Sequence, residues 1–115
     1  MAVPGVQSWT YTGVHCRTGA VLEITATGTV HYNRAASAGP AGDPDSSLRR
    51  YNVSGLAGAN HAGLIGSFDR RQPYFVVGSE ATLECRAGDR NLFLGINDAY
   101  VDDNSGKFTA IIKQR

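Results

Sequence analysis

The feature that most constrains the fold is an alternation of apolar and polar residues in VLEITATGTVHY, residues 21–32. Apolar side chains at every second position give an extended strand one apolar and one polar face, whereas a helix would need an apolar period of about 3.6 residues. The apolar positions are Leu22, Ile24, Ala26, Val30 and Tyr32. We therefore expect a strand here that buries one face in a core.

The same alternation recurs in NLFLGIND, residues 91–98, and in KFTAIIK, residues 107–113. Shorter candidate strands lie at residues 8–14, 63–68, 74–78 and 81–87. Clusters of Gly, Pro, Asn, Asp and Ser separate these runs, and no segment of helical length keeps a helical apolar period. The pattern predicts an all-β fold, an antiparallel two-sheet β-sandwich of jelly-roll-like kind, with almost no helix.

Length and charge narrow the function classes. The length and apolar content suit a single domain, residues 1–115. Eleven basic side chains stand against ten acidic ones, so no strong field attracts nucleic acid or an anionic membrane. No apolar run reaches the length of a membrane span, and the start MAVPGVQSW shows no export signal. We expect neither nucleic-acid binding nor membrane insertion, and the cellular location stays open.

The two cysteines, Cys16 and Cys85, lie far apart and form no CxxC pair. This spacing disfavours a zinc site and thioredoxin-type redox chemistry. Two alternatives remain, a pair of buried thiols or one disulfide, and we expect the buried thiols.

Residues 33–63 form a long Gly- and Ala-rich segment with no clear strand. Loops of this length in compact domains are usually functional, although a flexible surface excursion is the alternative. Asp43 lies here beside two prolines, where it could line a polar site or simply solvate a turn. Of the three histidines, His61 is the main candidate for a functional role, because it lies in this segment. Asn52 begins an NVS tripeptide that fits a glycosylation acceptor.

A second polar segment, INDAYVDDNSGKF, places Asp98, Asp102, Asp103 and Asn104 within seven positions between two apolar strands. Ca²⁺ takes about six to eight oxygen ligands, which carboxylates, an amide and free main-chain carbonyls can supply. The loop is not an EF-hand, because Thr109 stands where the final glutamate should be. The alternative is a hairpin turn at residues 104–106 with its aspartates in water.

Catalytic motifs are missing. The chain has no GxSxG elbow and no HExxH, and its glycine-rich stretch lacks the Lys-Ser/Thr ending of a phosphate-binding loop. We therefore expect a protein that is not an enzyme.

Five segments, in order, resemble the calcium-dependent galactose-binding lectins of the PA-IL (LecA) type. They are TGAVLEITATGTVHY, AGPAGD, GLIGSF, YFVVG and LFLGINDAYVDDNSGKFTAIIK, which together span nearly the whole chain. The resemblance implies a sandwich lectin or carbohydrate-binding module with Ca²⁺ as cofactor. Its expected partners are galactosides or other glycans with vicinal diols, and Ca²⁺ would bridge the protein loop and two neighbouring sugar hydroxyls.

The resemblance also implies the metal ligands. In that family the ion lies in the loop that matches residues 98–104. The implied ligands are the side chains of Asp98, Asp103 and Asn104, the main-chain carbonyl of Tyr32, and a further carbonyl from Val101 or Asp102. The loop is two residues shorter than the family pattern, and Asp103 replaces an asparagine.

The sugar contacts are less well matched. Ser46 and Arg49 stand where the family has a histidine and a glutamine that contact the sugar. The candidate sugar contacts are Asp43, Ser46, Arg49, His61, Asp98, Ala99 and Asp103.

Such a shallow site should bind one sugar weakly, with a dissociation constant of roughly micromolar to millimolar. Useful avidity would then require several copies, in a homo-oligomer or in a larger parent protein. The alternative to a lectin is a calcium-stabilised structural or assembly module that binds no sugar.

Overall fold

A computed structural model describes residues 1–115, and its elements are nine strands and three short 3₁₀ helices. No helix is long and apolar enough to cross a membrane. The strands are β1 (Ala2–Pro4), β2 (Trp9–His15), β3 (Val21–His31), β4 (Ser37–Ala38), β5 (Leu64–Phe68), β6 (Arg71–Val76), β7 (Glu80–Glu84), β8 (Asn91–Ile96) and β9 (Ser105–Gln114). The 3₁₀ helices are η1 (Ser46–Tyr51), η2 (Ser54–Leu56) and η3 (Val101–Asp103).

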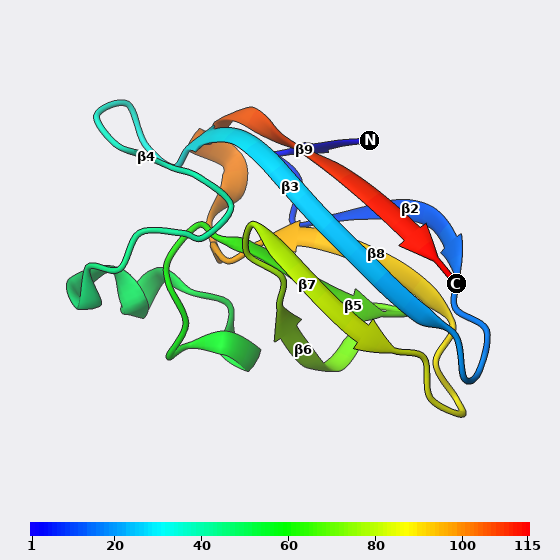
Figure 1. The fold of residues 1–115 in the computed structure, drawn as a ribbon. Helices are drawn as coiled ribbons and strands as arrows, with labels where there is room; N and C mark the ends of the chain where they lie inside the picture. Colours follow the sequence, from blue (N-terminus) through cyan, green and yellow to red (C-terminus); the bar gives the residue numbers. More distant parts are fainter.

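The strands form two antiparallel sheets that face each other (Figure 1). One sheet has the order β1-β9-β3, and both β4 and β7 pair with the remaining edge of β3. The other sheet has the order β2-β8-β5-β6. The predicted all-β sandwich with almost no helix is confirmed.

Strand β3 is the centre of the first sheet. Its ladder with β9 runs from the pair Leu22 and Gln114 to the pair His31 and Ser105. The predicted alternation is confirmed, because the five apolar positions of this segment are all buried: Leu22, Ile24, Ala26, Val30 and Tyr32. These side chains join a core to which β8 contributes Leu92, Leu94 and Ile96.

Two strands were not predicted. β1 spans three residues and β4 two, which is too short for an alternating pattern to be recognised. β1 extends the sheet by pairing with β9, and the N-terminal ammonium group of Met1 donates a hydrogen bond to the Ala110 carbonyl at 2.6 Å.

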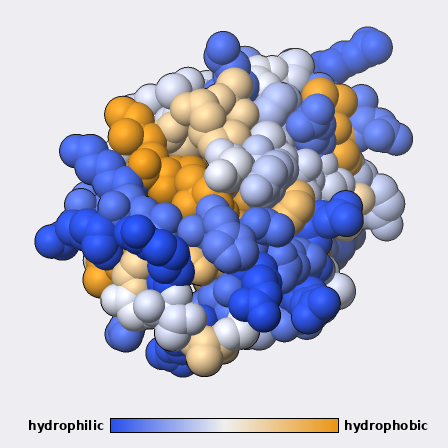
Figure 2. All heavy atoms as spheres, turned by 90° about the vertical axis from the view of Figure 1, so that its right-hand side faces the viewer, coloured by the Kyte–Doolittle hydropathy of each residue, from blue (hydrophilic) through white to orange (hydrophobic).

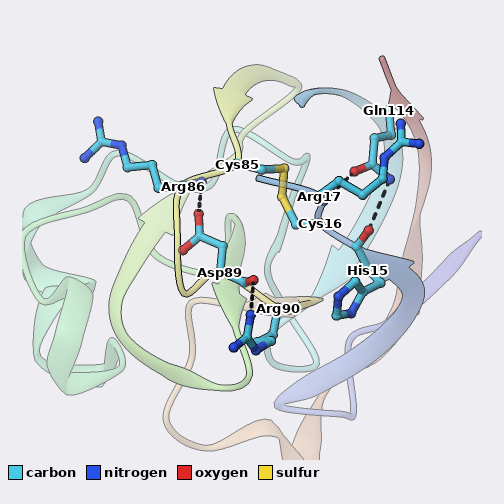
Figure 3. Close-up of a disulfide and its surroundings, with 8 residues drawn as sticks. All are labelled: His15, Cys16, Arg17, Cys85, Arg86, Asp89, Arg90 and Gln114. Atoms are coloured by element: carbon cyan, nitrogen blue, oxygen red, sulfur yellow. Dashed lines mark hydrogen bonds between the residues drawn. A yellow bond between two sulfur atoms is a disulfide. The ribbon is translucent and has the colours of Figure 1, made fainter. Parts of the chain in front are cut away.

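The expected pair of free thiols is wrong, because Cys16 and Cys85 form a disulfide with a Cα–Cα distance of 5.7 Å. Cys16 follows β2 in one sheet and Cys85 follows β7 in the other, so the bond ties the two sheets together at one end (Figure 3). The sequence did not predict this proximity, since the cysteines are 69 residues apart. Both are buried, as expected. Figure 2 shows this end of the molecule, where hydrophilic residues surround a smaller hydrophobic area.

Candidate functional site

The predicted site residues come from segments that follow β3 and β8 and precede β9. These segments lie at the opposite end of the sandwich from the loops that follow β2 and β7, which carry the disulfide (Figure 1). Tyr32 follows the end of β3, Asp98 follows the end of β8, and η3 leads into β9. Because β3 and β8 both end here and β9 begins here, segments far apart in sequence meet at this end. The long segment 33–63, with η1 and η2, covers the same end.

A cavity of about 370 Å³ opens among these segments. Tyr32, Asp98, Asp103 and His61 line it. The cavity thus brings together three implied metal ligands, two of which are also candidate sugar contacts, and His61 as a further candidate sugar contact. The remaining lining residues were not singled out in the sequence: Asn33, Leu48, Tyr51 and Tyr100. No motif marks them, because they come from three separate segments that only folding brings together.

A larger groove of about 680 Å³ lies elsewhere, between β6 and β7. Apolar side chains such as Phe68, Phe75 and Leu83 alternate there with charged ones. None of the predicted site residues lines it. Size alone therefore does not identify the functional site, and the smaller cavity is the better candidate because it collects the coordinating and hydrogen-bonding groups.

Asp98 is a buried carboxylate, with a relative exposure of 3%. Its Oδ1 accepts a hydrogen bond from the main-chain N–H of Tyr100 at 2.9 Å, while its Oδ2 lies 3.9 Å from Nε2 of His61. No lysine or arginine pairs with it. Burying a carboxylate is costly unless a cation or several donors compensate its charge. The position of Asp98 is therefore suited to a bound cation.

Asn104 supplies a second indication. It is buried, and its Nδ2 donates to the Gly5 carbonyl at 2.9 Å. Its Oδ1 is the one buried side-chain polar atom in the protein without a hydrogen-bond partner. Such orphaned atoms are rare in folded proteins, and an ion or ordered water is a common explanation. Oxygen is also the donor atom that Ca²⁺ prefers.

The main-chain carbonyl of Tyr32 is likewise free. Its N–H donates to the Ala36 carbonyl at 3.1 Å, but no protein group donates to its own oxygen. The carbonyl of Val101, in contrast, accepts from the N–H of Asn104 at 2.9 Å. Asp102 is exposed on η3 and does not line the cavity, so its side chain stands apart from the other implied ligands.

The residues present fit a calcium site only if amide and main-chain oxygens contribute. The structure contains no group of three or more His, Cys, Asp or Glu side chains arranged to hold a metal ion. Asp98, Asp103 and Tyr32 line one cavity, whereas Asn104 does not line it but follows Asp103 directly in the chain. Carboxylate, amide and main-chain oxygens of this kind are the donors that suit a hard cation.

Asp43 acts on the site through Tyr32. The phenolic O–H of Tyr32 donates to Oδ2 of Asp43 at 2.5 Å, and the N–H of Asp45 donates to Oδ1 at 3.0 Å. The hydrogen bond to Asp43 raises the pKa of Tyr32 to about 12, with a further contribution from burial. The same bond lowers the pKa of Asp43. The carboxylate of Asp43 is thus already engaged, and the residue does not line the cavity.

His61 is buried and held by Asn52 through a hydrogen bond of 2.9 Å between Nδ1 and Oδ1. The Nδ2 of Asn52 donates to three main-chain carbonyls, those of Leu56, Ala57 and Ala59. With its amide committed in this way, Asn52 offers no free nitrogen for a glycan in the folded chain. Burial lowers the pKa of His61, partly opposed by the charges of Asp98 and Asp43.

The long segment is ordered by a second asparagine. Asn97 is fully buried, and its Nδ2 donates to the carbonyls of Leu56 and Asn60 at 3.2 and 3.1 Å. Its Oδ1 accepts from the N–H of Val53 at 3.1 Å. These bonds attach the segment directly to the end of β8, so it is a fixed wall of the site rather than a free excursion.

Besides Asp43, three more candidate sugar contacts lie outside the cavity lining. Ser46 and Arg49 are exposed on η1, and neither lines the cavity. Ala99 is exposed, and its N–H donates to the Tyr51 carbonyl at 2.8 Å. The departures from the family pattern at Ser46 and Arg49 therefore coincide with exposed residues outside the cavity lining.

The chain matches no protein-family model and no curated protein. Among solved structures it is similar to a chain described as the EclA N-terminal domain, a PllA-like lectin. The two share a TM-score of 0.74 at 20% sequence identity, and the match covers 100% of this chain and 94% of the other. The protein therefore has the fold of this lectin domain over its whole length.

Proposed function

We propose that the protein is a calcium-dependent lectin or carbohydrate-binding module that binds galactosides or other glycans with vicinal hydroxyls. The observation that carries the proposal is the enclosed, unpartnered Oδ1 of Asn104 in the same loop as the buried, unpaired carboxylate of Asp98. Both are ligands that the sequence resemblance implies. The shared fold with a lectin domain supports the carbohydrate-binding class.

In this proposal Asp98, Asp103 and Asn104 hold the ion through their side chains. The carbonyls of Tyr32 and of Val101 or Asp102 complete the set. A bound Ca²⁺ would supply open coordination positions for two neighbouring sugar hydroxyls. The carboxylates of Asp98 and Asp103 accept hydrogen bonds from those hydroxyls, and such charge-assisted bonds are stronger than neutral ones.

The surrounding residues set the choice of sugar. Tyr51 and Tyr100 border the cavity with exposed rings, and His61 lies at its buried side. Ser46, Arg49 and Ala99 lie outside the lining and would contact only a ligand that extends beyond it. A homo-oligomer or a multidomain parent would raise the modest affinity of a single site by avidity.

Retention on a galactoside matrix with and without a chelator tests the proposal. Asp103→Ala should lose retention, because it removes a proposed calcium ligand. The variant should still fold, since Asp103 is exposed and its loss should leave the core intact. Glu80→Ala is the matched control, since Glu80 is an exposed acid on β7 away from the site. Unchanged retention of the wild type in chelator would refute the calcium-dependent mechanism.

A second candidate is a structural module in which calcium only fastens the loop. It is favoured by the exposed positions of Ser46 and Arg49, which leave the cavity without two of the sugar contacts of the family. Calcium would raise the melting temperature under either proposal, so thermal shifts do not distinguish them. A glycan array with and without calcium does, because only the lectin gives calcium-dependent hits.

A further inference from the structure

Asn52 fixes the ring of His61 in one orientation. The Nδ2 of Asn52 faces three main-chain carbonyls, which can only accept, so its Oδ1 is the atom that faces His61. Nδ1 of His61 must therefore donate the hydrogen in the 2.9 Å bond. In the neutral ring the lone pair is then on Nε2.

Aromatic contacts hold the ring plane as well. The ring of Tyr32 packs edge-on against His61 with centroids 4.9 Å apart, and the ring of Tyr51 lies 6.2 Å away. His61 has a relative exposure of only 2%, so its ring has little room to rotate. The direction in which Nε2 points is thus set by the fold.

Nε2 of His61 and Oδ2 of Asp98 lie 3.9 Å apart, which is too far for a hydrogen bond between them. Both atoms are acceptors in these protonation states, and both residues line the cavity. No protein group donates to either of them. Two acceptors at this spacing match a ligand with two neighbouring hydroxyls, each of which brings its own hydrogen.

We infer that His61 is a specificity-determining residue that accepts a hydrogen bond from one hydroxyl of the bound sugar, and that Asn52 is the positioning residue that aims it. This inference rests on the proposed lectin function. It adds that the site selects a sugar with a free hydroxyl beside the one that donates to Asp98. A glycan that is deoxygenated or O-methylated at that carbon leaves Nε2 unpaired and should bind more weakly.

The test compares methyl galactoside with each of its monodeoxy analogues by calorimetry in calcium, for the wild type and for His61→Phe. Losing the partner of a buried acceptor should weaken binding by about five- to tenfold or more. We expect one analogue to discriminate between the two proteins: the wild type should lose affinity for it relative to the parent sugar, whereas His61→Phe should not. Calcium affinity, measured in the same way without sugar, should be unchanged.

His15→Phe is the matched control. His15 is the second histidine whose Nδ1 lies near an asparagine, 3.1 Å from Oδ1 of Asn91, but it is exposed at the disulfide end (Figure 3). This variant should bind every analogue as the wild type does.

Nitrogen NMR of the wild type reads the tautomer directly. We expect a hydrogen on Nδ1 of His61 and none on Nε2, and a change in the Nε2 shift when the sugar binds. Asn52→Ala should allow both tautomers and weaken sugar binding without weakening calcium binding. If that variant does not fold, the wild-type spectrum alone still shows which nitrogen of His61 carries the hydrogen.

A protonated Nε2 in the neutral ring, or identical analogue profiles for the wild type and His61→Phe, would overturn this inference while leaving the lectin proposal standing. If the wild type binds calcium but no galactoside or other diol sugar, the lectin proposal fails, and the role of His61 fails with it.

Discussion

The side chain of Asn104 donates from Nδ2 to the carbonyl oxygen of Gly5 at 2.9 Å, and this bond leaves its own Oδ1 enclosed without a partner. Gly5 follows β1, so the contact connects the N-terminal strand to the loop that precedes β9. The amide is therefore held in the orientation that keeps its oxygen free. An ion or an ordered water is the usual partner of such a buried oxygen, and a cation is the partner that the proposed calcium site supplies.

Replacing Asn104 by alanine should lower calcium affinity at least tenfold, because a ligand that the fold holds in place is removed. The lost hydrogen bond to Gly5 should also reduce stability by about 1 kcal/mol. Calorimetric titration with Ca²⁺ measures the first effect and urea unfolding the second. Asn60→Ala is the control, since Asn60 is exposed and lies outside the loop of residues 98–104 that carries the implied ligands. Equal calcium affinity in both variants would remove Asn104 from the ligand set.

Breaking the disulfide should weaken the fold without disabling the site. Cys16 and Cys85 close a loop with a sequence separation of 69, for which chain entropy gives a stabilisation of about 4 kcal/mol. Cys16→Ser with Cys85→Ser should therefore shift the urea midpoint downward. Calcium affinity should be retained under conditions where the variant is folded, because the loops after β2 and β7 that carry the bond lie at the far end of the sandwich (Figure 1).

Tyr32 should ionise at a higher pH than an ordinary tyrosine. Its pKa of about 12 exceeds the ordinary value of 10.0 chiefly because its hydroxyl donates to Asp43. The folded state holds this proton more tightly than the unfolded state, so the contribution to stability is complete below pH 10 and is lost as the pH rises toward 12. Alkaline absorbance titration of the wild type against Tyr32→Phe isolates its signal.

The control for this titration is Asp43→Asn, which removes the negative charge. The pKa of Tyr32 should then fall toward 10, and an unchanged late titration would show that Asp43 is not its cause.

Gly28 should be intolerant of a side chain. It lies opposite Phe108 in the β3–β9 ladder with a φ of +102°, and an added Cβ would lie 2.6 Å from the Lys107 carbonyl oxygen. Gly28→Ala should cost about 1–3 kcal/mol through strain and displacement of β9. Gly58→Ala is the control, since nothing lies within 4 Å of its added Cβ. Chemical unfolding of both variants measures the difference.

The sequence predicted the sandwich well because its signal is local. Burial alternates along β3 as the sequence does, and an apolar period of two specifies which face meets the core. The disulfide was missed for the opposite reason. The proximity of Cys16 to Cys85 depends on how β2 and β7 are placed in two different sheets, and no local pattern records that placement.

The candidate site likewise contains residues that a local motif predicts and contacts that only the fold creates. Asp98, Asp103 and Asn104 lie in one short segment, so a sequence motif marks them before the structure is known. The pairing of Asn52 with His61 is invisible in the sequence, because it depends on the path of the long segment over the end of β8. Ser46 and Arg49 occupy the sequence positions of two sugar contacts of the family, yet neither residue lines the cavity.

Calcium-dependent sugar binding is tested most directly by a calorimetric titration of the protein with methyl galactoside in calcium and again in excess chelator. A calcium-dependent lectin should show saturable binding in calcium with a dissociation constant of about micromolar to millimolar, and no heat of binding in chelator. Identical isotherms in the two conditions would contradict the proposed calcium dependence.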